Sequence, residues 1–226
     1  MDRLYRTRLL FGDCGTEKLK RSTVMVVGCG AVGSFAIEAL ARTGVGHMIV
    51  VDFDVVEESN INRQLFALDS TVGMPKVDVA AARIHDINPD IAVDARNLRW
   101  DESTDLDVIP DFIIDAIDSV ESKVALYKWA NARNVPLISS MGAASKTDAT
   151  KIKIAPLSKT TVCPLAARVR RLMRGSDLPD FPAVFSTENP AMVVGHAKNL
   201  GSIMTITGTF GLIMANYVIG EIVCNK

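Results

Sequence analysis

The chain has 226 residues, 48% of them hydrophobic, and a mean hydropathy of +0.21. This length and composition exclude a disordered chain and indicate one substantial buried core. Lys and Arg total 25 against 26 Asp and Glu, so the net charge of −1 does not select a class of partner. The cysteines form no C-x-x-C pair, which argues against a zinc site or a disulfide framework, and the Arg-rich N-terminus lacks an apolar signal segment. We therefore expect a cytoplasmic protein.

Apolar runs and helical periodicities alternate along the first two thirds of the chain. Strands are predicted at residues 22–28, 47–54, 91–98, 111–118 and 135–140, and helices at residues 31–44, 76–88 and 120–134. Such alternation is typical of right-handed crossovers between parallel strands. The predicted fold class is therefore α/β, with a doubly wound, mainly parallel Rossmann-like sheet.

The last third of the chain is less regular. Strand-like segments are predicted at residues 150–157 and 183–188, a basic helix at 164–174 and an apolar helix at 199–220. The apolar helix is long enough to span a bilayer, but its glycines and polar residues favour a buried helix, so contact with a membrane is not expected. We divide the chain into an N-terminal arm (1–22), a Rossmann-like core (23–144) and a C-terminal extension (145–226) of the same structural unit.

Charge is unevenly distributed along the chain. All charged residues from 101 to 121 are acidic, whereas the charged residues from 146 to 174 are all basic except for Asp148. If the basic side chains share a face, they form an electropositive surface that suits a polyanion. The alternative is a solvated helix face.

A glycine-rich motif, Gly28-Cys29-Gly30-Ala31-Val32-Gly33, lies between the first predicted strand and helix. Glycine at Gly28, Gly30 and Gly33 allows a tight turn and lets backbone N–H groups and a helix N-terminus approach phosphates. Asp52, at the end of the second strand, can accept hydrogen bonds from ribose hydroxyls. The motif predicts a nucleotide site, and the alternative is a turn needed only for packing.

The polar residues after Asp52 favour ATP over NAD. A nicotinamide cofactor would leave Asn60, Arg63 and Gln64 without a role. Displacement at the α-phosphorus of ATP builds negative charge on phosphate oxygens, which fixed cations stabilise. Arg63 offers a planar fork for phosphate and Lys76 a point charge. The alternative for Arg63 is a surface ion pair.

An acid also follows the fourth predicted strand. Asp118 is placed there to hold a Mg²⁺ ion bound to the phosphates. The alternative is a helix N-cap, a role that Ser119 could equally fill.

The chain resembles a known superfamily in several of these segments. This superfamily includes the ubiquitin-activating enzymes and the bacterial enzymes that adenylate thiamin and molybdopterin sulfur carriers, and the chain is similar to its ATP-binding half. The matching segments are GCGAVGS, ALARTGVG, VDFDVVEESNINRQ, VGMPKVDV and DAIDSVESK. Within that superfamily it resembles the tRNA threonylcarbamoyladenosine dehydratases in RLYRTRLLFG, ISSMGAASKTDATKIKIAPLSKTTVCPLAARVRR and VFSTENP. The resemblance covers nearly the whole chain, and the later segments select the tRNA branch.

The resemblance implies roles for the matching positions. Arg6 matches an arginine that reaches across a homodimer into the partner's ATP site, and the alternative is an exposed basic arm. Arg6, Arg63, Lys76 and Asp118 would act in catalysis, and Asp118 would also bind Mg²⁺. The implied ATP contacts are Gly28, Gly30, Gly33, Asp52, Asp54, Ser59, Asn60, Arg63, Gln64, Lys76, Asp118 and Ser119.

The resemblance also implies a reaction. ATP would activate the threonyl carboxylate of N6-threonylcarbamoyladenosine in tRNA, as an adenylate or an acyl phosphate, and the carbamoyl group would close a ring with net loss of water. The tRNA backbone would lie on the basic segment, and DNA is not an expected partner. A sulfur-transfer protein is a further candidate partner. The candidate RNA contacts are Lys146, Lys151, Lys159, Arg168 and Arg171.

Cys163 and two departures from the family pattern bear on the RNA side. Cys163 could form a thioester in its basic surroundings, but a packed cysteine without chemistry is the favoured interpretation. Gly142 is the only glycine of residues 139–144, a tract that is richer in glycine in some relatives. The segment SDLPDFP, before Val184, is short. Both departures suggest a reshaped RNA contact.

Two other functions remain open at this stage. The first is adenylylation of a sulfur carrier that ends in Gly-Gly, although such enzymes commonly carry C-x-x-C pairs that this chain lacks. The second is a nucleotide-binding scaffold or a redox module of the NAD type, in which Arg6, Arg63, Lys76 and Asp118 would have no role.

Overall fold

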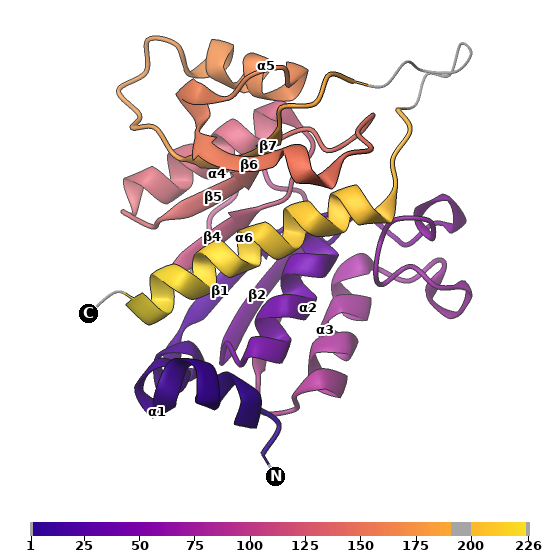
Figure 1. The fold of residues 1–226 in the computed structure, drawn as a ribbon, viewed down its shortest axis with the longest axis vertical. Helices are drawn as coiled ribbons and strands as arrows, with labels where there is room; N and C mark the ends of the chain where they lie inside the picture. Colours follow the sequence, from indigo (N-terminus) through magenta and orange to yellow (C-terminus); the bar gives the residue numbers. More distant parts are fainter. Residues whose placement is uncertain (1, 191–199, 225–226) are drawn as a thin grey trace.

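The computed structural model describes residues 2–190 and 200–224 (Figure 1). Its centre is a seven-stranded sheet in the order β3-β2-β1-β4-β5-β7-β6. The strands are β1 (Thr23–Val27), β2 (His47–Asp52), β3 (Ala92–Asn97), β4 (Phe112–Asp115), β5 (Leu137–Ser140), β6 (Ile152–Pro156) and β7 (Pro182–Ser186). All neighbouring strands are parallel except β6, which pairs antiparallel with β7 at one edge. The predicted doubly wound α/β fold is therefore confirmed.

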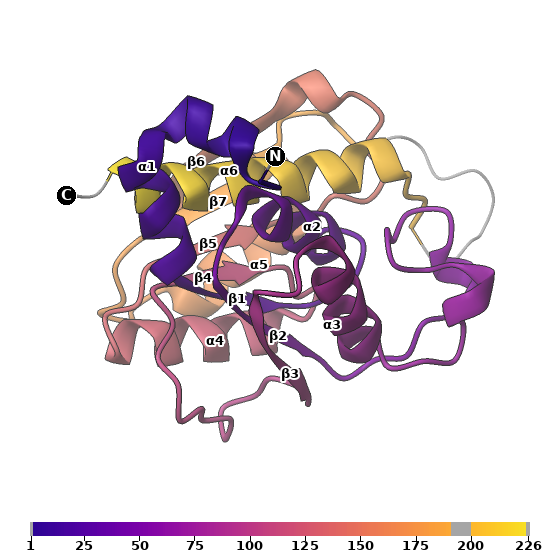
Figure 2. The ribbon, with the colours of Figure 1, turned by 90° about the horizontal axis from the view of Figure 1, so that it is seen from below.

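Helices cover both faces of the sheet (Figures 1 and 2). They are α1 (Tyr5–Arg21), α2 (Gly33–Thr43), α3 (Lys76–Ile87), α4 (Val120–Ala132), α5 (Pro164–Met173) and α6 (Met204–Cys224). One hydrophobic cluster joins the sheet to α1, α2, α3 and α6, and a second joins it to α4 and α5. The strands alternate between these clusters because successive side chains of a strand point to opposite faces.

Helix α6 packs closely against α2. A Cβ added at Gly211 would lie 2.2 Å from the Val32 oxygen, and one at Gly208 would lie 3.1 Å from the Phe35 ring. By length and composition α6 is the one described helix that could span a membrane, but half of its most apolar stretch is buried in the protein. The glycines of α6 therefore serve helix packing, and the predicted start of this helix, Asn199, lies outside the described residues.

The N-terminal arm is a helix, α1, which the sequence pattern did not predict. Gly12 has φ +70° and ψ −179°, so it breaks α1 into two halves. The second half packs on α6, where Lys18 Nζ donates to the Val223 oxygen. In the first half Leu9 and Leu10 are 64% and 75% exposed.

Candidate functional site

The loops that carry the candidate residues leave the carboxyl ends of β1, β2 and β4. Strand β1 lies between β2 and β4, so the chain reverses its direction of winding there. The crevice beside such a reversal is where open α/β sheets bind ligands.

The glycine motif forms the turn after β1. Gly28 has φ +97°, and a Cβ there would lie 2.7 Å from the Ala116 oxygen; a Cβ at Gly33 would lie 1.7 Å from the Gly28 oxygen. Both glycines are required by the protein's own packing. Gly30 differs, because a Cβ there would lie 3.7 Å or more from any neighbour, the nearest being Gln64.

The N-terminus of α2 follows this turn and has no cap. Val32 provides no side-chain hydrogen bond, and the first turn of α2 contains no acid. Ser34 Oγ instead accepts a hydrogen bond from the Leu65 N–H, 3.1 Å away, which ties α2 to the loop after β2. The Ser34 N–H donates to the Gly30 backbone oxygen at 3.0 Å. A helix N-terminus with no side-chain cap and no acid of its own still suits a phosphate.

Asp52, the predicted ribose acid, stands beside the glycine turn. Its carboxylate accepts hydrogen bonds from the Cys29 N–H at 2.6 Å and the Asp54 N–H at 2.9 Å. The Cys29 thiol is enclosed beside it, and burial and the Asp52 charge raise its pKa well above the usual value. The turn therefore holds a neutral thiol and a fixed carboxylate side by side.

Lys76 pairs with Asp54 in the structure. Its Nζ lies 2.9 Å from Asp54 Oδ2, and its side chain is 8% exposed against 49% for Asp54. The Lys76 N–H also donates to the Asp54 oxygen, so α3 begins directly beside the end of β2. The Lys76 ammonium is therefore buried at the carboxyl edge of the sheet, with its charge compensated by Asp54.

Arg63 and Asn60 belong to the irregular loop after β2. Asn60 is buried, and its backbone oxygen accepts hydrogen bonds from the N–H groups of Arg63 and Gln64. Arg63 Nη1 donates to the Ser59 backbone oxygen at 2.7 Å and to Asn62 Oδ1 at 2.9 Å. Gln64 reaches the turn at Gly30. The loop thus places the Arg63 guanidinium at the carboxyl edge of the sheet, and only its Nη1 is used in these two bonds.

Asp118 is exposed after β4 and makes no hydrogen bond or ion pair with any residue that the structure describes. Ser119, not Asp118, caps α4, by accepting the Ser122 N–H. Within the described residues no three His, Cys, Asp or Glu side chains gather as a metal site. A single free carboxylate nevertheless fits Mg²⁺, which is usually bound through one or two carboxylates together with substrate phosphates.

A buried polar group beneath this edge was missed by the sequence analysis. Lys123 Nζ lies 2.9 Å from Asp115 Oδ2 and 3.2 Å from Ser139 Oγ, and Ser139 Oγ donates to Asp115 at 2.6 Å. Asp115 Oδ1 also accepts the Ile117 N–H, so the group fixes the turn that leads to Asp118. Its only signal was the position of Lys123 at the end of DAIDSVESK.

Arg6 lies at the opposite end of the sheet. Its neighbour Leu4 packs on Gly44, at the end of α2, and Arg3 donates to the Ile87 oxygen, at the end of α3. Both contacts are at the amino ends of the strands, and a strand of five or six residues is about 17 to 20 Å long. Arg6 therefore does not reach the site of its own chain.

The basic residues of 146–174 do not share one face. Lys146 is buried, and its ammonium donates to the Glu188 oxygen. Lys151 lies two residues after Ala149, which packs with the α6 cluster, whereas Arg168 and Arg171 are exposed on α5 at the other face. Lys159 is exposed between them in the chain. The expectation of a single electropositive face is therefore wrong for Lys146. The other four residues are exposed, two of them on the segments that flank edge strand β6 and two on α5.

Cys163 caps α5 from inside the protein. Its sulfur is buried and accepts hydrogen bonds from the Gly142 N–H at 3.2 Å and the Ala166 N–H at 3.5 Å. This placement agrees with the packed role that the sequence favoured.

The model of the ThiF family matches residues 2–224, so the chain belongs to that family. A relative from Bacillus subtilis, a tRNA threonylcarbamoyladenosine dehydratase, is 48% identical over 192 residues, which are 83% of this chain and 76% of the relative. The ATP complex of Escherichia coli tRNA N6-threonylcarbamoyladenosine dehydratase superposes with a TM-score of 0.91 at 33% identity, over 97% of this chain and 93% of that one. A molybdopterin-synthase adenylyltransferase from Haemophilus influenzae is 40% identical over 55% of this chain and 52% of its own.

Proposed function

We propose that this protein is an ATP-dependent dehydratase that cyclises the threonylcarbamoyl group of N6-threonylcarbamoyladenosine in tRNA. The observation that carries this proposal is the match to a dehydratase structure along 97% of the chain, including the part after residue 145. The adenylyltransferase match covers about half the chain.

In the proposed site the turn at Gly30 and the N-terminus of α2 hold the phosphates of ATP. Asp52 holds the ribose, because its carboxylate is already oriented by two backbone N–H groups. Arg63 and Lys76 stabilise the negative charge that develops on the phosphate oxygens. Asp118 would hold Mg²⁺, which supplies further compensation of that charge.

The reaction needs activation because the threonyl carboxylate has no good leaving group. Its oxygen forms a bond to a phosphorus of ATP, and pyrophosphate leaves if an adenylate forms, or ADP if an acyl phosphate forms. The carbamoyl group then attacks the acyl carbon, releases AMP or phosphate, and gives up one proton. No enzyme nucleophile is needed, because the attacking group is in the same molecule at high effective concentration.

A homodimer is part of the proposal. Arg6 is exposed at the amino edge of its own sheet, and the exposed Leu9 and Leu10 lie close to it on the same half of α1. If Arg6 completes the partner's site, Arg6→Ala and Arg63→Ala variants will each be inactive alone. Mixing the two under subunit exchange will restore activity, because one site of each mixed dimer has both arginines. No recovery would contradict the arrangement in trans.

The RNA surface is proposed for the exposed cations around β6. Lys151, Lys159, Arg168 and Arg171 would contact phosphates, so affinity should fall as salt rises, with a slope of about −0.7 to −0.9 per contact. Arg168→Ala should lower that slope by about one unit for every sequence of tRNA. An unchanged slope would place the RNA elsewhere.

The decisive experiment uses purified protein, ATP, Mg²⁺ and tRNA that carries threonylcarbamoyladenosine. Mass spectrometry of the gently digested RNA should find the nucleoside lighter by one water, and Arg63→Ala and Asp118→Ala should abolish it. Release of pyrophosphate or of phosphate then distinguishes the adenylate from the acyl phosphate. If no product forms, while ATP is consumed once a Gly-Gly carrier protein is added, the protein is an adenylyltransferase.

A further inference from the structure

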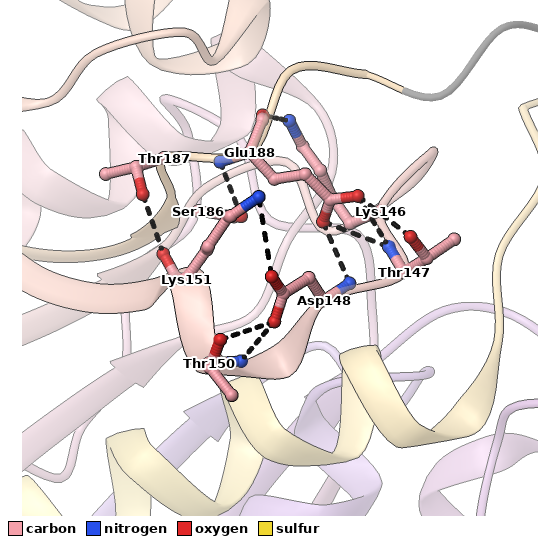
Figure 3. Close-up of polar contacts among 8 residues, drawn as sticks. All are labelled: Lys146, Thr147, Asp148, Thr150, Lys151, Ser186, Thr187 and Glu188. Atoms are coloured by element: carbon pink, nitrogen blue, oxygen red, sulfur yellow. Dashed lines mark hydrogen bonds and ion pairs between the residues drawn. The ribbon is translucent and has the colours of Figure 1, made fainter.

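Glu188, just after β7, joins two segments that are distant in sequence. Its carboxylate accepts the Thr147 and Asp148 N–H groups, each at 3.0 Å, and the Thr147 hydroxyl at 2.9 Å (Figure 3). Two consecutive N–H groups that point at one anion form a concave anion site, here filled by the protein's own carboxylate. The hydrogen bond from Asp148 is the main cause of a lowered pKa for Glu188, so the group is ionised at neutral pH.

The backbone of Glu188 is held as firmly as its side chain. Its N–H donates to Ser186 Oγ at 3.1 Å, and its oxygen accepts the buried Lys146 ammonium. The next residue back, Thr187, donates its N–H to the Lys151 oxygen at 3.0 Å. We call residues 145–148 the clamped loop, because Glu188 holds it through both its carboxylate and its backbone oxygen.

The clamped loop continues toward the ATP side of the site. Ser145 has φ +58°, and its N–H donates to the Gly201 oxygen at 2.8 Å. Ser202, the next residue, accepts a hydrogen bond from Asn62 Nδ2 at 3.0 Å. Asn62 Oδ1 in turn accepts Arg63 Nη1 at 2.9 Å. Hydrogen bonds joined by two short backbone segments, 145–147 and 201–202, therefore lead from Glu188 to the Arg63 guanidinium.

We propose that Glu188 is a positioning residue for carboxylate activation: through the clamped loop, Ser202 and Asn62, it holds the Arg63 guanidinium in place. This rests on the proposed function, in which Arg63 faces the reacting phosphate. Glu188 itself touches neither ATP nor the substrate carboxylate. Its effect falls on the step in which negative charge is greatest, so the loss belongs to kcat rather than to the KM for ATP.

Glu188→Gln is the sharpest test, because glutamine keeps the shape but replaces one acceptor oxygen with a donor that opposes the N–H groups. We expect kcat to fall about ten- to a hundredfold, the cost of displacing a catalytic group by up to about 1 Å, while the KM for ATP changes less than about twofold. Asp111→Asn is the matched control, since Asp111 also accepts a backbone N–H from a distant segment, that of Thr23, but lies at the amino end of the sheet, away from Arg63. It should leave kcat unchanged.

A double-mutant cycle separates positioning from a merely structural role. If Glu188 acts through Asn62, the double variant Glu188→Gln/Asn62→Ala will be no slower than the slower single variant, because both changes break one series of contacts. Fold losses in kcat that multiply would overturn the proposal. So would a Glu188→Gln enzyme with wild-type kcat.

Hydrogen exchange of the full-length protein without tRNA gives an independent readout. The amides of residues 61–65 should exchange faster in Glu188→Gln than in the wild type or in Asp111→Asn. A change confined to residues 145–151 would overturn the inference. If the wild type yields no cyclised nucleoside, the proposed function fails, and this readout still decides whether Glu188 controls the Arg63 loop.

Discussion

Lys123 Nζ lies 2.9 Å from Asp115 Oδ2, and both side chains are only 2% exposed. Removing one partner of a buried ion pair leaves the other charge without compensation, which typically costs about 3–5 kcal/mol. Lys123→Met should therefore lower the free energy of unfolding by about that amount, measured by urea denaturation at pH 7. The control Lys128→Met breaks the exposed pair with Glu102 and should cost less than about 1 kcal/mol. Equal effects of the two changes would contradict the structural role of Lys123.

Gly30→Ala tests whether the glycine turn binds phosphate or serves packing alone. A Cβ at Gly30 has no neighbour closer than 3.7 Å, whereas one at Gly33 would meet the Gly28 oxygen at 1.7 Å. Gly30→Ala should keep the wild-type melting temperature but lose the rise in melting temperature that ATP produces with Mg²⁺, because the methyl group stands where the phosphates approach. Gly33→Ala should unfold the protein. An ATP effect that survives in a folded Gly30→Ala variant would place the phosphates elsewhere.

The contact of α6 with α2 gives a pair of opposite predictions. A methyl group at Gly211 would lie 2.2 Å from the Val32 oxygen, so Gly211→Ala must displace one helix and should cost about 1–3 kcal/mol. Gly220, on the same helix, has nothing within 4 Å of an added Cβ. Gly220→Ala should stabilise the protein by about 0.4–1 kcal/mol, because alanine loses less backbone entropy on folding. Denaturant titration of both variants measures the difference, and two changes of the same sign would show that α6 is packed differently.

The features that the sequence predicted are those with local signals. The spacing of Gly28, Gly33 and Asp52 is such a signal. One strand, one turn and one helix that follow each other along the chain fix it. The alternation of apolar runs with helical periodicities is also a local signal, and it predicted the parallel sheet. Helix α1 was missed because Gly12 interrupts it and charged residues obscure its buried side.

The features that the sequence did not predict depend on partners far along the chain. Lys146 looked like a surface cation, but its acceptor is the oxygen of Glu188, 42 residues later. The Asp115 carboxylate needs Ser139, which comes from the next strand. No periodicity within either segment encodes such pairings, since only the order of strands in the sheet brings the groups together.

Glu38 on α2 predicts how stability depends on pH. Partial burial acts to raise its pKa, but two hydrogen bonds from Arg83, at 2.9 Å each, and one from Arg42 outweigh it, and the pKa lies below the usual 4.5. A pKa lower in the folded than in the unfolded state contributes stability that is present above pH 4.5 and is lost as the pH falls through the folded value. Arg83→Met should therefore destabilise the protein at pH 7 and much less at pH 3, as measured by urea titration at both values. Arg42→Met removes only one bond and should show the same trend with a smaller size, and a loss in Arg83→Met that is independent of pH would mean that the Glu38 charge is not what Arg83 stabilises.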